Sequence, residues 1–242
     1  MLGPVSPAGA AIVGGEPIIV AGSAGQVRPA AERAAAVEQH FREELAQRAI
    51  DGEWRMLNRA ELAELVRLAK AVDLVVLGQY SEGDADSGTW LRPDDLMTDI
   101  GRPILVVPYA GVFGDVGRRV LIAWDGTREA NRALHDALAL IGNAEEVMVI
   151  HIGKRETDLD ADRPALDQIV RHLARHGISA RPEESPRGDI PVPDILLSRA
   201  ADLGADMIVA GAYHHSHLRE SLLGGVSRGL LEHMTVPVLM SH

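Results

Sequence analysis

The most informative stretch of the chain is Ala205–His242, with the sequence ADMIVAGAYHHSHLRESLLGGVSRGLLEHMTVPVLMSH. Its pattern predicts a buried strand at Met207–Ala210, a glycine at the strand end (Gly211), and a polar loop. Gly224-Gly225 then opens a short amphipathic helix, and Val236–Met240 predicts a second buried strand. A strand that leads through a glycine-rich loop into a helix suits phosphate binding, because glycines allow close backbone approach and the helix start offers unpaired N–H groups. Glycine loops also make ordinary tight turns.

Parts of this stretch occur a second time in the chain. An amphipathic helix followed by Asp, four apolar residues and Gly ends at Gly78 and again at Gly211, 133 residues later. A strand that begins with proline occurs at Pro103 and again at Pro237, 134 residues later. A separation held this closely predicts tandem domains. We expect a first domain over residues 1–110, a glycine-rich linker over residues 111–117 and a second domain over residues 118–242.

The second domain alternates strands with helices. Its first strand is expected at Arg119–Trp124, followed by a turn at Asp125-Gly126-Thr127 and a helix with one apolar face, made of Ala130, Ala133, Leu134, Ala137, Leu138 and Ile141. Further strands are expected at Glu146–Ile152 and Ile178–Glu183, and further helices at Arg163–His176 and Pro191–Leu203. This alternation predicts the α/β class, as two tandem doubly wound domains with mainly parallel sheets.

The first domain lacks its front end if the repeat is extrapolated, because its first strand and most of its first helix would precede Met1. A start site placed too late, a shortened form, or a substitute strand within Ala11–Ala21 would each account for this. The remaining elements are expected as helices at Ala30–Ala49 and Ala60–Ala71 and strands at Trp54–Leu57, Leu74–Gly78 and Ile104–Val107.

Composition narrows the class of protein. The net charge of −11 argues against nucleic acid as a partner, and the absence of cysteine excludes disulfides and thiolate chemistry. No apolar run reaches the ~18–20 residues that span a bilayer, and the first residues lack the basic region of a signal peptide. We therefore expect a soluble, cytoplasmic α/β protein with no membrane partner.

The C-terminal stretch resembles the end of a universal stress protein domain, whose nucleotide loop runs Gly, two residues, Gly, nine residues, Gly, then Ser or Thr. Gly211 and Gly224 match the first and third glycines with that spacing. His214 stands in place of the second glycine and Gly225 in place of the hydroxyl residue. The resemblance covers residues 118–242 well and residues 30–110 weakly. It implies a fold like that of the adenine-nucleotide α-hydrolases and a cytoplasmic stress-response protein that is no enzyme, present as a homo-oligomer or an internal pseudo-dimer.

The same resemblance implies a binding site for ATP with its Mg²⁺ in the second domain. An aspartate at the position of Asp125 would contact the adenine end, Ile152 would pack on the base, and Gly224, Gly225 and Val226 would contact the phosphates. Taken from the residues alone, Asp125 equally fits a turn or helix cap, and Ile152 fits a plain strand position. A side chain at His214 would crowd the phosphates and weaken binding, although a protonated imidazole would offset part of that loss.

Other chemistries have less support in the sequence. The cluster His214-His215-x-His217 fits a solvated loop better than a metal site. No Gly-x-Ser-x-Gly elbow and no Gly-Lys-[Ser/Thr] phosphate loop occur, so we expect no catalytic residues. In the first domain an acidic loop follows Gly78, and it predicts loss of nucleotide binding there. Two alternatives remain: an interaction scaffold that binds no nucleotide, and, with less support, an enzyme acting on an adenylate.

Overall fold

The structure is a computed structural model, and it describes residues 11–13, 30–57, 61–79, 93–153, 156–212 and 225–242. The chain divides into two compact units, Met1–Ala110 and Gly111–His242. No helix in the described ranges combines the length and the apolar character that crossing a membrane requires.

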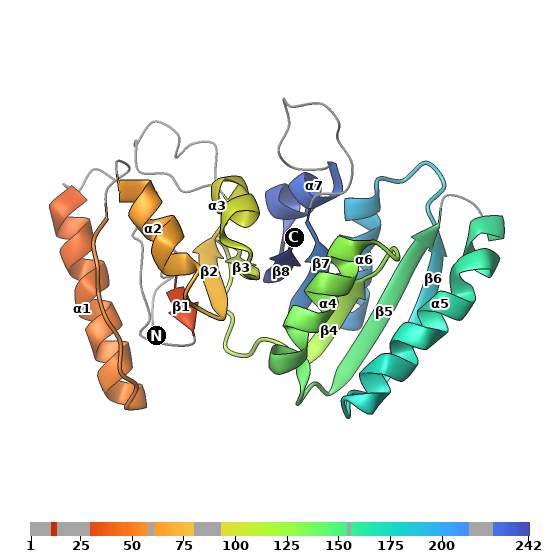
Figure 1. Cartoon of the computed structure of the whole chain (residues 1–242), viewed down its shortest axis with the longest axis horizontal. Helices are drawn as coiled ribbons and strands as arrows, with labels where there is room; N and C mark the ends of the chain where they lie inside the picture. The colour runs from red at the N-terminus through yellow and green to blue at the C-terminus, as the bar shows by residue number, and fades with distance from the viewer. Residues whose placement is uncertain (1–10, 14–29, 58–60, 80–92, 154–155, 213–224) are drawn as a thin grey trace. The chain divides into compact units, whose positions relative to one another are not determined.

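The second unit is a doubly wound α/β domain (Figure 1). Its described strands lie in the order β8-β7-β4-β5-β6, and each neighbouring pair is parallel. Because the first strand of the unit is central, the chain winds outward to one side and then to the other. The elements are β4 (Arg119–Ala123), α4 (Arg128–Ile141), β5 (Glu146–Gly153), α5 (Glu156–Arg175), β6 (Ala180–Pro186), α6 (Val192–Leu203), β7 (Met207–Gly211), α7 (Gly225–His233) and β8 (Val238–Ser241). The predicted α/β class with mainly parallel strands is confirmed.

Helices cover both faces of this sheet, which explains its composition. In Figure 1, α4 and α5 lie in front of the strands while α6 and α7 lie behind them. Strands β4, β7 and β8 are therefore buried on both sides, and their cores are continuous apolar runs: Val120–Ile122, Met207–Val209 and Val238–Met240 are all 0 % exposed. The predicted face of α4 is buried as expected, except that Leu138 is half-buried.

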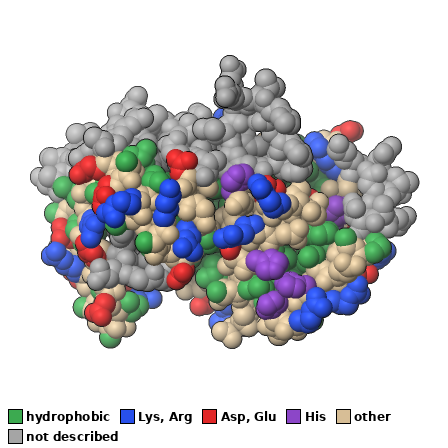
Figure 2. All heavy atoms as spheres, viewed as in Figure 1, with side chains coloured by type: hydrophobic (Ala, Val, Ile, Leu, Met, Phe, Trp, Pro, Cys, Tyr) green, Lys and Arg blue, Asp and Glu red, His purple; other side chains and the backbone are tan. Residues whose placement is uncertain are grey.

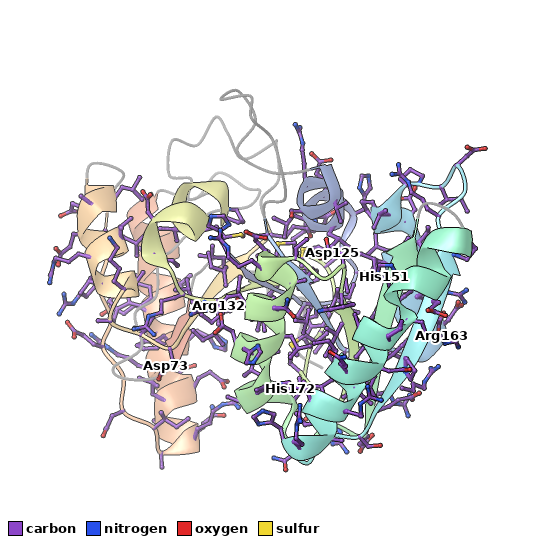
Figure 3. The ribbon with its side chains drawn as sticks, turned by 45° about the vertical axis from the view of Figure 1, so that its right-hand side comes forward. Asp73, Asp125, Arg132, His151, Arg163 and His172 are labelled. Atoms are coloured by element: carbon purple, nitrogen blue, oxygen red, sulfur yellow. The ribbon has the colours of Figure 1, made fainter. Side chains whose placement is uncertain are left out.

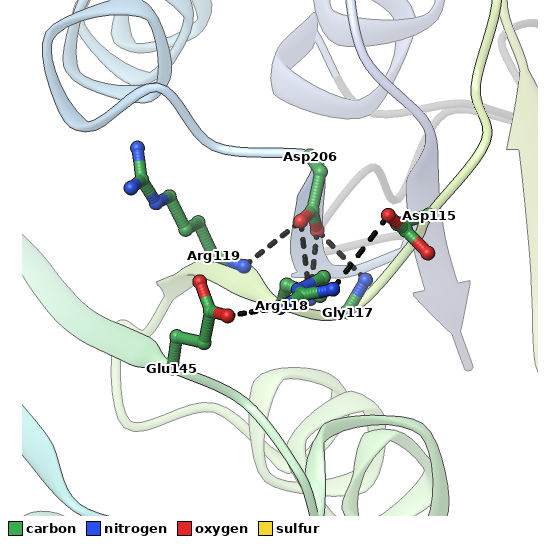
Figure 4. A network of polar contacts seen from close by, with 6 residues as sticks. All are labelled: Asp115, Gly117, Arg118, Arg119, Glu145 and Asp206. Atoms are coloured by element: carbon green, nitrogen blue, oxygen red, sulfur yellow. Dashed lines mark hydrogen bonds and ion pairs between the residues drawn. The ribbon is translucent and has the colours of Figure 1, made fainter.

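The starts of β4 and β7 are joined by one carboxylate (Figure 4). Asp206 accepts hydrogen bonds from the backbone N–H groups of Gly117 at 2.7 Å, Arg118 at 3.1 Å and Arg119 at 2.9 Å. Arg118 in turn pairs with Glu145, at the turn before β5. The central strands of the second unit are thus held together at their amino ends by side-chain as well as ladder hydrogen bonds.

The first unit contains β1 (Ala11–Val13), α1 (Ala30–Arg48), α2 (Leu62–Ala69), β2 (Leu74–Gly78), α3 (Pro93–Ile100) and β3 (Ile104–Val107). β2 and β3 are parallel, whereas β1 pairs with β2 antiparallel. In the second unit the corresponding side of β7 is occupied by β4, in parallel. Strand β1 lies within Ala11–Ala21, the segment in which one of the three alternatives expected a substitute strand, but it is short and runs antiparallel to β2.

The two units contain the same hydrogen-bonded strand pair. Gly78 lies opposite Val107, as Gly211 lies opposite Ser241. The flanking bonds also correspond. Val75 N–H donates to the Pro103 carbonyl at 3.0 Å, and Ile208 N–H donates to the Pro237 carbonyl at 2.9 Å. Each proline precedes its strand and contributes only its carbonyl, so the missing N–H costs nothing.

Two predicted elements need correction, and one helix was not predicted. The strand expected at Trp54–Leu57 is wrong, because residues 51–57 form neither helix nor strand; Trp54 packs instead on Phe41 of α1, with ring centroids 5.8 Å apart. Helix α5 begins at Glu156 rather than Arg163, since its first turns are acidic and carry no apolar periodicity. Helix α3 was not predicted, because its apolar positions span barely two turns between polar residues.

Candidate functional site

A pocket of about 270 Å³ opens at the carboxyl ends of the central strands in the second unit. This is the edge where ligands bind in doubly wound sheets. The pocket is bounded by the ends of β4, β5 and β7, by the first turns of α4 and α7, and by α6. Its lining consists of Ala123, Trp124, Asp125, Thr127, Glu129, Ala130, Ile150, Ile152, Val192, Leu196, Ala210, Gly211, Gly225, Val226 and Ser227.

The structure brings together five of the seven residues that the sequence singled out. Asp125, Ile152, Gly211, Gly225 and Val226 all line this pocket, although they come from four different elements or turns. His214 and Gly224 lie outside the described residues, as does the histidine cluster of the same loop.

Asp125 follows the end of β4 and has a clear local role (Figure 3). Its Oδ1 accepts hydrogen bonds from the backbone N–H of Thr127 at 3.1 Å and from the Thr127 hydroxyl at 2.6 Å. Thr127 is the N-cap of α4, and its Oγ1 accepts the N–H of Ala130 at 3.1 Å. The turn therefore uses one carboxylate oxygen of Asp125, and within the described residues no hydrogen bond engages the other.

Gly211 is required by packing between β7 and α4. A Cβ at this position would lie 2.6 Å from the backbone nitrogen of Ala130 and 2.7 Å from the carbonyl carbon of Glu129. Real Cβ atoms do not approach backbone so closely, so the first turn of α4 can reach β7 only because residue 211 has no side chain. The glycine that resembles a phosphate-loop residue has a structural reason of its own.

The start of α7 contributes Gly225, Val226 and Ser227 to the lining of the pocket. A Cβ added at Gly225 would meet no described atom within 4 Å, so this position faces open space. Val226 is 40 % exposed, whereas Ser227 is buried and also lines the pocket. The first turn of a helix carries N–H groups without intrahelical partners, and these suit an anion or a polar ligand group.

The remaining lining residues were not singled out from the sequence. Trp124 is buried at the end of β4 and donates from Nε1 to Asn131 Oδ1 at 3.0 Å, while its carbonyl lies 3.1 Å from His151 Nδ1. Ile150 and Leu196 add apolar surface. The strand-end position of Trp124 could have indicated it, whereas α6 residues such as Leu196 reach the pocket only through the packing of that helix.

Glu129 is a carboxylate within the pocket lining, in the first turn of α4, and only 9 % exposed. Burial raises its pKa, but a hydrogen bond from its own backbone N–H and the guanidinium of Arg128 outweigh that effect. The pKa of Glu129 therefore lies below its ordinary value. Arg128 donates to Glu129 Oε1 from Nη2 at 2.9 Å and from Nε at 3.1 Å. The side chain is held ionised beside the pocket.

Within the described ranges, no group of three His, Asp or Glu side chains is arranged to hold a metal ion. Together, the strand order and this pocket define a doubly wound α/β protein with a cavity at the carboxyl edge of its sheet.

Comparison with known proteins identifies the family. The model of the universal stress protein family matches residues 117–242, which is just over half of the chain. The chain therefore belongs to the universal stress protein family. No protein of curated function matches its sequence.

Solved structures share the fold. A universal stress protein from Archaeoglobus fulgidus superposes with a TM-score of 0.65 at 20% identity, over 87% of this chain and 76% of that chain. A functionally unknown protein from Pseudomonas aeruginosa gives 0.57 at 18% identity, over 90% and 79%. A further Archaeoglobus fulgidus universal stress protein, solved in complex with dAMP, gives 0.41 at 20% identity, over 52% and 97%. At identities this low, the first two similarities show the fold alone.

Proposed function

We propose that the second unit binds an adenine nucleotide or nucleoside in this pocket, and that the protein is a non-catalytic, cytoplasmic stress-response protein. The observation that carries the proposal is that residues selected from separate parts of the sequence lie together in one pocket. Five residues chosen from the sequence for contact with different parts of ATP line one pocket at the carboxyl edge of the sheet.

The chemistry of the lining fits such a ligand. Ile150, Ile152 and Leu196 offer apolar surface for a purine ring, and the outer oxygen of Asp125 can accept a hydrogen bond from an amino or hydroxyl group. The first turn of α7 offers backbone N–H groups to a phosphate or a ribose hydroxyl. The pocket volume, about 270 Å³, lies near the lower end of the range for small-ligand sites.

ATP with Mg²⁺ is the cofactor that the family resemblance implies, and we propose that it binds only weakly here. Gly225 has no hydroxyl to offer a phosphate, and the lost charge-assisted hydrogen bond corresponds to roughly 1.5–3 kcal/mol. The residues would bind and orient the nucleotide, and we assign no catalytic step to them.

We also propose that residues 1–110 are a degenerate copy of the same domain, so that the chain is a tandem protein. The matching register of β2–β3 and β7–β8 supports this. Tandem copies would give an internal pseudo-dimer, and copies of the whole chain a homo-oligomer.

A scaffold that binds no nucleotide is the second candidate. Two observations favour it: packing against α4 explains Gly211, and the turn with Thr127 explains Asp125. Both residues would then be structural.

Calorimetric titration with Mg·ATP and with adenosine separates the candidates. The informative variant is Asp125→Asn, because its amide oxygen can still accept the Thr127 N–H and so preserves the turn. Asp136→Asn, an exchange of the same type farther along α4, serves as the control. We expect binding to weaken roughly tenfold in Asp125→Asn, the loss of one charge-assisted contact, and to persist in the control. Equal affinity in both variants would reject the site, and no heat with any ligand would support the scaffold.

A further inference from the structure

We propose that Glu129 is a specificity-determining residue of the pocket, and that it favours an uncharged adenine nucleoside over nucleoside triphosphates. This proposal rests on the adenine site proposed above. It concerns a carboxylate that the resemblance to the family did not single out.

Glu129 is placed where a bound phosphate chain would meet it. Its Cβ would lie 3.0 Å from a Cβ at Gly211, the first glycine of the stretch that resembles a phosphate loop. Both residues line the pocket, and the short distance follows from the packing of α4 on β7. The side chain of Glu129 thus begins beside Gly211, at the carboxyl end of β7.

The start of α4 offers little to a ligand anion, because three of its N–H groups already donate hydrogen bonds within the chain. The N–H of Ala130 donates to Thr127 Oγ1 at 3.1 Å, and the N–H of Asn131 donates to the Thr127 carbonyl at 3.1 Å. The N–H of Glu129 donates to its own carboxylate, which is one cause of its low pKa. A helix start that would otherwise attract phosphate is therefore already occupied by a carboxylate of the chain.

The charge of the described lining also disfavours a polyphosphate ligand. Asp125 and Glu129 are the charged side chains among the described lining residues, and both are acidic. Arg128 pairs with Glu129, but its own side chain is 80% exposed and does not line the pocket. Glu129 is paired with Arg128, whereas Asp125 has no ion pair among the described residues, so the described lining carries a net negative charge. A polyphosphate is repelled by such a lining, whereas a ribose hydroxyl can donate a hydrogen bond to it.

The test compares adenosine, AMP and ATP as calorimetric ligands of the full chain at neutral pH. In the wild type we expect affinity to fall in the order adenosine, AMP, ATP. In Glu129→Gln, which keeps the size and the hydrogen-bonding oxygen, we expect ATP affinity to rise roughly tenfold, as removal of one nearby unit charge implies. Adenosine affinity should change by less than about threefold, because the amide oxygen of Gln can still accept a hydrogen bond from the nucleoside. Glu146→Gln, at the opposite end of the strands, should leave all three affinities unchanged.

A second measurement needs the wild type alone. Salt screens charge repulsion, so raising ionic strength from about 0.05 to 0.3 M should narrow the preference for adenosine over ATP. A wild type that prefers ATP, or an unchanged ATP affinity in a folded Glu129→Gln variant, overturns the role of Glu129 while leaving the adenine site in place. Failure of all three ligands to bind would overturn the site and the inference with it.

Discussion

His135 of α4 and His172 of α5 lie with their ring centroids 4.9 Å apart, and His176 lies 4.7 Å from His172. Figure 2 shows histidine side chains gathered on this face of the second unit. Nε2 of His172 is buried and has no hydrogen-bond partner in the described part of the chain. Burial lowers the pKa of His172, and the neighbouring His135, His176 and Arg175 lower it further.

The first prediction is that acid destabilises the second unit through His172. Its pKa in the folded state lies below the ordinary value of 6.5, so the unfolded chain takes up the proton more readily. The histidine therefore costs no stability above pH 6.5, and the free energy of unfolding falls as pH drops below that value. Urea unfolding at several pH values between 5 and 8 measures the slope. His172→Gln should make the slope shallower, whereas His233→Gln, on the exposed side of α7, should not; equal slopes would exclude His172 as the cause.

The second prediction concerns Asp206 and its counterpart in the first unit, Asp73. Asp206 accepts three backbone N–H groups before and within β4, while Asp73 is exposed and has no hydrogen-bond or ion-pair partner among the described residues. Asp206→Ala should lower the free energy of unfolding by about 2 kcal/mol, because charged hydrogen bonds are lost. Asp73→Ala should stay within about 0.5 kcal/mol of the wild type. Equal losses in chemical denaturation would contradict this assignment.

The third prediction is that Gly211→Ala destabilises the protein by about 1–3 kcal/mol. The added Cβ would meet backbone atoms of α4, which cannot move aside as a flexible side chain would. Gly225→Ala is the matched control, since its Cβ meets open space and alanine favours the helix start. Thermal unfolding of both variants checks the contrast, and a neutral Gly211→Ala would mean that α4 and β7 pack less closely.

The fourth prediction concerns phosphate affinity at the start of α7. Gly225→Ser adds a hydroxyl where the structure leaves room, and it should tighten Mg·ATP binding by about 1.5–3 kcal/mol, the contribution of one hydrogen bond to a charged group. Gly225→Ala separates the hydroxyl from the added carbon. The same gain in both variants would show that helix stability, and not a phosphate contact, produces it.

Much of the second unit could be predicted from sequence because each signal has a local cause. The buried strands of β4 and β7 are continuous apolar runs, and the turn at Asp125 precedes a capped helix. The polar first turns of α5 and the short α3 lack such periodicity, so their formation depends on tertiary packing. Trp54 shows the opposite error, since its segment has strand-like residues but pairs with no strand in the described part of the chain.

The candidate site likewise contains some residues that the sequence indicated and others that it did not. Asp125, Ile152 and Gly211 were recognisable because they stand at strand ends or in a spaced glycine pattern. Glu129 and Leu196 carry no local signal, since they reach the pocket through the angle at which α4 and α6 pack on the sheet. The sequence pattern assigned Gly211 to a loop motif, but it did not indicate the close approach of Gly211 to Ala130, which is seen only in the structure.

The equal ladders of β2–β3 and β7–β8 have a consequence for folding. During refolding, β3 and β8 can each form the same backbone hydrogen bonds with either β2 or β7. Backbone hydrogen bonding alone therefore does not distinguish the native pairs β2–β3 and β7–β8 from the exchanged pairs β2–β8 and β7–β3. The native pairing is therefore selected by the side chains, which differ between β3 (Ile104, Leu105 and Val106) and β8 (Val238, Leu239 and Met240). Mispaired closing strands are the characteristic error of repeated sequences, and slow synthesis, which lets the first pair form before the second emerges, would suppress it.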